Sequence, residues 1–70
     1  MNLDRVRGII RTYIGIKHSF IYKGSRNQKE EFDGYITECY PYIFIIKTTE
    51  GVIKSFSYND FIIKSIRILP

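Results

Sequence analysis

The sequence contains 70 residues, which is the length of one small domain. Hydrophobic residues make up 44% of the chain, an ordinary fraction for a folded protein, so the composition argues against disorder. Eleven Lys and Arg residues against seven Asp and Glu residues give a net charge of +4. This modest excess permits nucleic-acid or acidic partners but does not require them.

Cysteine content and hydropathy exclude several further classes. The chain has one cysteine, Cys39, so no disulfide can form within it, and Cys39 with the single His18 does not make a recognisable zinc site. No apolar run approaches the roughly 18–20 residues of a membrane span. The charged first residues, MNLDRVRG, lack the apolar core of a signal peptide. We therefore predict a cytoplasmic protein without membrane association and without a cofactor.

The first predicted element is an α-helix over residues 3–14, because the apolar side chains recur there with the helical period. Asn2 precedes it as an N-cap, and Gly15 follows it as the C′ residue. A helix of about three turns is marginal alone, so its apolar face must dock on the rest of the chain or on a partner. That face consists of Leu3, Val6, Ile10, Tyr13 and Ile14.

Five strands are predicted after the helix. The hydrophobic period changes there to alternation, and residues 42–49 are apolar at nearly every position through Ile46, which indicates a central strand covered on both faces. Gly34 lies inside the second strand, where it indicates a bend that lets one strand belong to both halves of a small barrel. A 3₁₀-like turn at residues 58–60 separates the last two strands. The predicted strand ranges are 16–23, 29–39, 42–49, 52–57 and 61–69.

This order predicts a single domain over residues 1–70, with the helix at about 3–14 and a barrel at about 16–69. The predicted fold class is mainly β: a small, strongly bent antiparallel β-barrel of about five strands with an N-terminal α-helix. Closing the sheet in this way removes its exposed edges.

The first candidate site is Tyr40-Pro41-Tyr42, between the second and third predicted strands. Proline fixes φ, which favours a structural corner whose tyrosine rings cap the end of the barrel. The other interpretation is an exposed aromatic platform that stacks nucleobases or anchors a partner. We predict that Pro41 is structural and that at least one of Tyr40 and Tyr42 is partly exposed.

Two sets of basic residues are further candidate contacts with a partner or a nucleic acid. The set around the first hairpin loop either keeps that tip soluble or contacts phosphates. The set on the helix either belongs to a solvated face with one ion pair to Asp4 or contacts phosphates. The hairpin set is Lys23, Arg26 and Lys29, and the helix set is Arg7 and Arg11.

Catalytic chemistry has little support in the sequence. Glu30, Glu31 and Asp33 form an exposed run without a paired histidine, and Cys39 has no neighbour that would activate its thiol. His18 shares a strand face with apolar residues and is interpreted as a wall residue. The chain also lacks a phosphate-binding glycine loop. We predict that the protein is not an enzyme and has no small-molecule substrate.

Two motifs, in this order, resemble the Veg family of small proteins from Gram-positive bacteria, also labelled biofilm-formation stimulators. They are G-x-x-x-E-x-Y-P, within GYITECYPYIFII, and S-x-S-Y-x-D, within SFSYNDFIIKSIRIL, and the resemblance covers about residues 3–69. It implies an SH3-like or Sm-like barrel with an N-terminal helix and a non-enzymatic role in transcription regulation and in biofilm or growth control. The matching positions are Gly15, Gly24, Arg26, Gly34, Glu38, Tyr40, Pro41, Phe44, Ser55, Ser57, Tyr58 and Asp60.

Within that set, some residues are interpreted as structural, with Asp60 forming and capping the turn after the fourth strand. These structural residues are Gly15, Gly34, Pro41, Tyr58 and Asp60.

Three functional hypotheses stay open. In the first, a regulatory module binds a macromolecular partner, with a transcription regulator or its DNA as the target class. In the second, the small barrel binds DNA or RNA directly and with weak specificity. In the third, the functional unit is a homo-oligomer, because a thin core and strand edges favour self-association.

Overall fold

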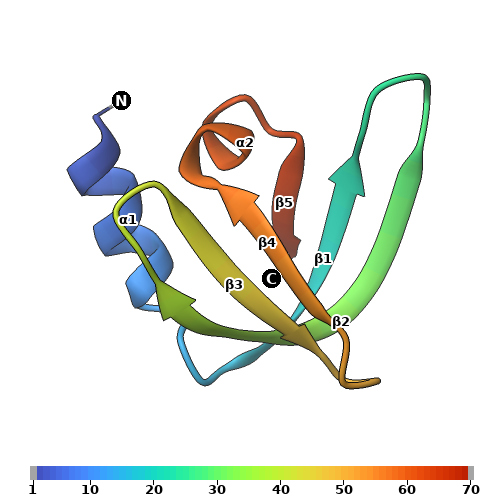
Figure 1. Ribbon diagram of the computed structural model, residues 1–70, viewed down its shortest axis with the longest axis horizontal. Coiled ribbons are helices and arrows are strands. Elements are labelled where there is room, and N and C mark those ends of the chain that lie inside the picture. Colours follow the sequence, from blue (N-terminus) through green and yellow to red (C-terminus); the bar gives the residue numbers. More distant parts are fainter. Residues whose placement is uncertain (1, 70) are drawn as a thin grey trace.

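The elements follow the predicted order of one helix and then strands (Figure 1). The computed structural model describes residues 2–69. It is mainly β, with five antiparallel strands in one sheet behind a short N-terminal helix, as predicted. The elements are α1 (Leu3–Arg11), β1 (Lys17–Lys23), β2 (Lys29–Cys39), β3 (Ile43–Thr48), β4 (Ile53–Ser57), α2 (Tyr58–Ile62) and β5 (Ile66–Leu69).

The sheet has the order β4-β3-β2-β1-β5, so β4 and β5 are its two edges. Figure 1 shows β2 curving strongly through the sheet, and α2 linking the end of β4 to β5. In the described part of the chain no strand pairing joins β4 to β5. The sheet therefore curls like a barrel but remains open between its edges.

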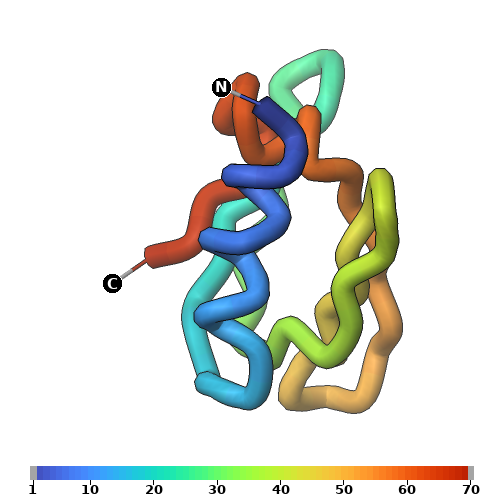
Figure 2. Tube along the Cα trace, turned by 90° about the vertical axis from the view of Figure 1, so that its left-hand side faces the viewer, coloured from blue at the N-terminus to red at the C-terminus, as the bar shows by residue number. Residues whose placement is uncertain are grey.

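The core lies inside this curl and is covered by α1. Val6 and Ile10 of α1 are fully buried, and Figure 2, seen from the α1 side, shows the helix lying along the folded sheet. Aromatic rings fill much of the interior, with Phe20 and Phe32 stacked at 5.5 Å between centroids. The buried apolar residues are Val6, Ile10, Phe20, Ile36, Phe44, Ile46, Phe56, Tyr58 and Ile66.

The helix begins as predicted and ends earlier than predicted. The Asn2 side chain accepts a hydrogen bond from the Arg5 backbone N–H at 2.8 Å, which makes it the N-cap. The C-cap is Thr12, so the predicted extension to residue 14 and the predicted C′ role of Gly15 are wrong. Gly15 instead has φ +81° in the turn toward β1, and its N–H donates to the Ile36 carbonyl at 3.1 Å. The contact of this turn with β2 therefore forms in place of a further turn of α1.

Residues 58–65 form a short α-helix and its exit, where a 3₁₀-like turn and an earlier start of the last strand were predicted. A capping box starts α2: the Asp60 N–H donates to Ser57 Oγ at 3.0 Å, and the Ser57 N–H donates to Asp60 Oδ2 at 3.1 Å. At the other end Lys64 has φ 64°, and the Ser65 N–H donates to the Asp60 carbonyl at 2.8 Å. These bonds delay β5 to Ile66.

Gly34 lies where β2 passes from one partner strand to the other. It is paired with His18 of β1 and with Thr48 of β3. A Cβ at this position would lie 2.5 Å from the Lys47 carbonyl oxygen, so the close approach of β3 requires glycine. The irregularity in strand register occurs slightly later, between Ile36 and Glu38.

Replacing Gly34 with alanine should destabilise the domain by at least about 1–3 kcal/mol, because the new methyl group overpacks the β2–β3 contact. The matched control is Gly8→Ala in α1, where a Cβ meets nothing within 4 Å and should stabilise by about 1 kcal/mol. Urea unfolding followed by circular dichroism measures both. A Gly34→Ala variant as stable as the parent would show that β3 can move away at this point.

Truncating Ile10 to alanine should cost about 2–4 kcal/mol, because it opens a cavity under a fully buried side chain of α1. Ile14→Ala is the control, since the Ile14 side chain is 41% exposed and its truncation should cost much less. Thermal unfolding of the two variants distinguishes them. An unchanged midpoint for Ile10→Ala would contradict the docking of α1.

Candidate interaction site

The corner Tyr40-Pro41-Tyr42 joins β2 to β3 and turns both tyrosine rings outward. The Tyr40 N–H donates to the Ile43 carbonyl at 2.8 Å, which closes a tight turn around Pro41. Tyr40 is 46% exposed and Tyr42 is 74% exposed. The expected partial exposure of at least one tyrosine is therefore observed, and neither ring caps the end of the barrel.

Every backbone carbonyl of the corner is bound by a residue distant in sequence. The Tyr58 hydroxyl donates to the Tyr40 carbonyl at 2.6 Å, and the Tyr58 N–H donates to the Tyr42 carbonyl at 3.1 Å. Arg7 of α1 donates from Nη2 to the Pro41 carbonyl at 3.1 Å. Because α1 and α2 both hold the corner, its backbone is fixed while its rings face solvent.

Arg7 connects the corner to α1 through several contacts. Its Nη1 lies 3.3 Å from the Asp4 carboxylate, which is the ion pair predicted for the helix. Its guanidinium carbon lies 5.9 Å from the centroid of the Tyr58 ring, within the range of a cation–π contact. The guanidinium is therefore engaged inside the molecule, whereas Arg11, one turn later, is exposed.

The Tyr40 side chain is held by a neighbour on β2. Its hydroxyl donates to Glu38 Oε2. This hydrogen bond and the charge of the Glu38 carboxylate raise the pKa of Tyr40 above its ordinary value of 10.0. The Tyr40 ring is thus oriented by Glu38, and the hydroxyl keeps its proton at neutral pH.

The basic residues of the first hairpin lie in a separate place, at the tip that joins β1 to β2 (Figure 1). Arg26 and Asn27 both have φ 61°, the left-handed conformation, at the centre of a turn over residues 25–28 in which the Gln28 N–H donates to the Ser25 carbonyl at 3.4 Å. Lys29 lies 3.3 Å from the Glu31 carboxylate. Of the candidate contacts, the structure brings Arg7, Tyr40 and Tyr42 together at the corner. The other group, at the tip of the first hairpin, consists of Lys23, Arg26 and Lys29. Their binding roles stay predictions.

Sequence reasoning missed the parts that Tyr58 and Arg7 play in holding the corner. A signal for Tyr58 was present, because an aromatic residue between the S-x-x-D positions of a capping box begins a helix at the edge of the core. No local pattern could show that Arg7 reaches Pro41, which lies 34 positions away.

Outside the corner, three further features of the described residues concern metal-binding clusters, the surroundings of the single histidine and membrane-spanning helices. No cluster of three or more His, Cys, Asp or Glu side chains in residues 2–69 is arranged to hold a metal ion. His18 Nδ1 lies 3.0 Å from the Ile16 carbonyl oxygen, and its ring contacts Tyr13 edge-on at 4.9 Å between centroids. Over the same residues, neither helix has the length and apolar character that crossing a membrane needs.

Comparison with known proteins gives one result for the whole chain. A family model described as "Biofilm formation stimulator VEG" matches residues 1–69. No match is found among curated proteins.

Removing the Tyr58 hydroxyl in Tyr58→Phe should cost about 0.5–1.5 kcal/mol at neutral pH, because the Tyr40 carbonyl loses its donor. Burial raises the pKa of Tyr58 above 10.0 in the folded protein, so its contribution is complete below pH 10.0 and is lost as the pH rises through the folded pKa. The difference between parent and variant should therefore shrink in alkaline buffer. Urea unfolding at neutral and alkaline pH measures it, with the exposed Tyr42→Phe as control. A difference that grows with pH would contradict the assignment.

Proposed function

The chain belongs to the family of biofilm formation stimulator Veg, and from this membership and the fixed aromatic corner we propose a non-catalytic regulatory protein that binds a macromolecular partner. The partner class is a transcription regulator, and the site of action is the cytoplasm. Membership in the family connects the chain with biofilm formation, and the corner supplies the surface for binding.

The observation that supports the proposal is the exposed ring of Tyr42 on a backbone whose carbonyls are held by hydrogen bonds from α1 and α2. Tyrosine is enriched among the residues that dominate binding energy, because its ring offers a large contact area and its hydroxyl tolerates water. Since the three carbonyls of the corner are already bound by Arg7 and Tyr58, little backbone conformational freedom remains to be lost on association. Preorganisation of this kind raises affinity.

The apolar surface continues from the corner along the outer face of β3. Phe44 and Ile46 point into the core, so the alternating Ile43 and Ile45 lie on the opposite face. Ile43 is exposed, and Ile53 of the neighbouring β4 is exposed on the same outer face. A partner seated on Tyr42 would find further apolar contacts there.

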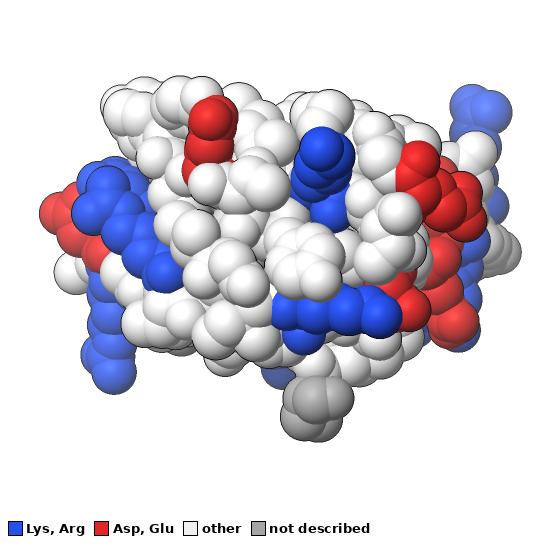
Figure 3. Space-filling model, turned by 90° about the horizontal axis from the view of Figure 1, so that it is seen from below, with Lys and Arg blue, Asp and Glu red and all other residues white. Residues whose placement is uncertain are grey.

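A second candidate function, weakly specific nucleic-acid binding, is favoured by one row of residues across the sheet. Lys17 of β1 pairs with Tyr35 of β2, and Tyr35 pairs in turn with Lys47 of β3. All three are exposed, so an aromatic ring lies between two ammonium groups, as in a site that stacks a base and contacts phosphates. Seen from below, Figure 3 shows basic side chains grouped at the left end and scattered across the middle, with acidic side chains gathered at the right, so this face has no continuous basic surface.

Tyr42→Ala should abolish partner capture and leave stability nearly unchanged, because the side chain is 74% exposed. Ile63→Ala is the matched control, an exposed apolar residue after α2 that should retain capture. The measurement is a pull-down from native lysate, with and without nuclease, next to thermal unfolding of each variant.

Pro41→Ala should instead mainly lower stability, because it loosens the turn.

Each outcome of this experiment separates the hypotheses. Capture that survives nuclease and disappears in Tyr42→Ala supports a protein partner at the corner. Capture lost with nuclease, together with direct binding to DNA or RNA that weakens steeply with salt, supports the second candidate. A concentration-dependent mass that falls in Tyr42→Ala supports a homo-oligomer. Equal capture by the parent and Tyr42→Ala would refute the corner as the binding surface.

A further inference from the structure

β2 has a length of strand edge that β3 does not cover. It pairs with β1 from Lys29 to Tyr35, but its pairing with β3 begins at Gly34. The Thr49 N–H donates to the Asp33 carbonyl at 2.9 Å, so the backbone groups of Asp33 face the β3 side. Backbone direction alternates along a strand, hence the N–H and C=O of Glu31 face the same side, beyond the end of β3.

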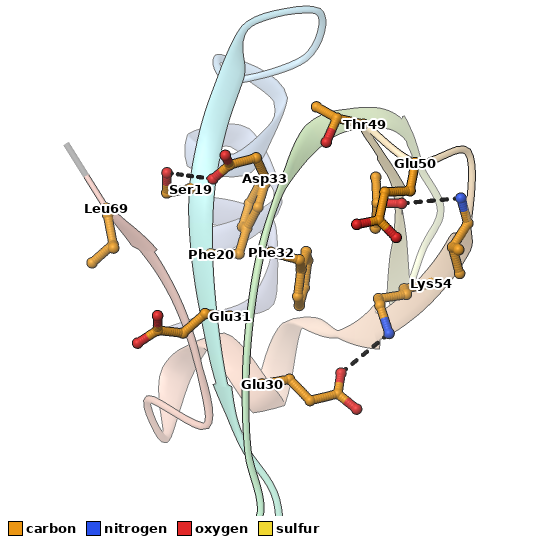
Figure 4. A pocket seen from close by; sticks show the side chains of 12 residues that line it. Ser19, Phe20, Glu30, Glu31, Phe32, Asp33, Thr49, Glu50, Lys54 and Leu69 are labelled. Carbon is orange, nitrogen blue, oxygen red and sulfur yellow. Dashed lines mark hydrogen bonds and ion pairs between the residues drawn. The ribbon is translucent and has the colours of Figure 1, made fainter.

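A groove of about 720 Å³ runs beside this edge. Its lining comes from β2, from the end of β3 and the turn after it, from β4, and also from Ser19 and Phe20 of β1 and Leu69 of β5. Figure 4 shows Phe32 of β2 and Glu50 of the turn on opposite sides of the hollow. Four carboxylates line the groove, those of Glu30, Glu31, Asp33 and Glu50. The protein carries a net charge of +4, so this groove has the opposite sign to the whole.

The groove already holds one ammonium group of the chain itself. Lys54 Nζ lies 3.1 Å from Glu30 Oε2 and 5.2 Å from the centroid of the Phe32 ring. A carboxylate and an aromatic face together are the chemistry that binds a lysine or arginine side chain. This internal contact occupies Glu30. Along the edge, Lys29 Nζ lies 3.3 Å from the Glu31 carboxylate and Ser19 Oγ donates to Asp33 Oδ1 at 2.6 Å, and both carboxylates remain exposed together with Glu50.

We infer that the edge of β2 from Lys29 to Phe32, short of the point where Thr49 binds Asp33, accepts an extended segment of a protein partner that carries Lys or Arg at alternate positions. The free backbone groups of the edge provide main-chain hydrogen bonds, as in other cases of strand addition. Every second side chain of the added strand then lies near Glu31 and Asp33, while the intervening ones face Phe32. The negative lining repels nucleic-acid phosphates, so the occupant is a protein segment. This inference goes beyond the proposed function and does not use the tyrosine corner.

The test uses a fluorescent heptapeptide of alternating lysine and valine, with a glutamate–valine peptide of the same length as control. Fluorescence anisotropy at low salt should show binding of the lysine peptide only, and binding should weaken as salt screens the charges. Hydrogen exchange of the Glu31 amide should slow on binding, because that N–H becomes paired.

Two substitutions of Glu31 distinguish the contribution of its backbone N–H to peptide binding from that of its side-chain charge. Glu31→Gln removes the charge and should weaken binding roughly threefold, while Glu31→Pro also removes the edge N–H and should weaken it roughly tenfold or more. Proline is tolerated on a strand where the N–H does not pair, so the fold should persist. The control Asp4→Asn removes an exposed carboxylate from α1 and should leave peptide binding unchanged.

The results decide the inference in every case. Equal binding of both peptides, or loss in Asp4→Asn equal to that in Glu31→Gln, overturns it. If Glu31→Pro does not fold, the exchange rate of the Glu31 amide in the parent decides: unchanged exchange with peptide overturns the inference. Protection of that amide without peptide, with a doubled mass, assigns the edge to a second copy and also overturns it. Tyr42→Ala should bind the peptide like the parent, so failure of the proposed function at the corner is distinguishable.

Discussion

The buried Tyr58 holds together parts of the chain that would otherwise be separate. Its hydroxyl and its backbone N–H bind two carbonyls of the corner between β2 and β3, and its ring stacks on Phe44 at 5.6 Å between centroids. Arg7 lies against the same ring and binds the remaining carbonyl of the corner. α1, α2 and the β2–β3 connection are thereby fixed around one side chain, and this lets the exposed tyrosines stay in place without covering.

The two sequence motifs, G-x-x-x-E-x-Y-P and S-x-S-Y-x-D, meet at this point. In the first, Gly34 admits the close approach of β3 and Glu38 orients Tyr40. In the second, Ser57 and Asp60 cap α2 and so place Tyr58 against the corner. The contacts that these motif residues make therefore build and hold the corner.

The sequence predicted the parts of the fold that depend on local pattern. Alternation and, for β3, a continuous apolar run located the strands, and Asn2 was correctly identified as the N-cap of α1. The expectation that both faces of β3 are covered was wrong, because Ile43 is exposed. The errors arose where tertiary contacts overrode that pattern: the turn at Gly15 docks on Ile36 and shortens α1, and caps on both sides of α2 replace the first residues of the predicted last strand. Of the candidate site, the exposure of the tyrosines was predictable, while the bond from Arg7 to Pro41 joins residues that no local pattern connects.

The pairing of β5 with β1 has a consequence for how the protein folds during synthesis. All other strand pairs join neighbours in sequence and can form as hairpins soon after their residues are made. The β1–β5 ladder joins Ser19 to Leu69 and must close a loop that spans most of the chain, which is the slowest kind of contact to form. Until β5 has been synthesised and has docked, β1 remains an open edge beside an incomplete core. The nascent chain therefore passes through a stage in which β1 is free to pair with other chains, and the time spent there depends on the delivery of its last four-residue strand.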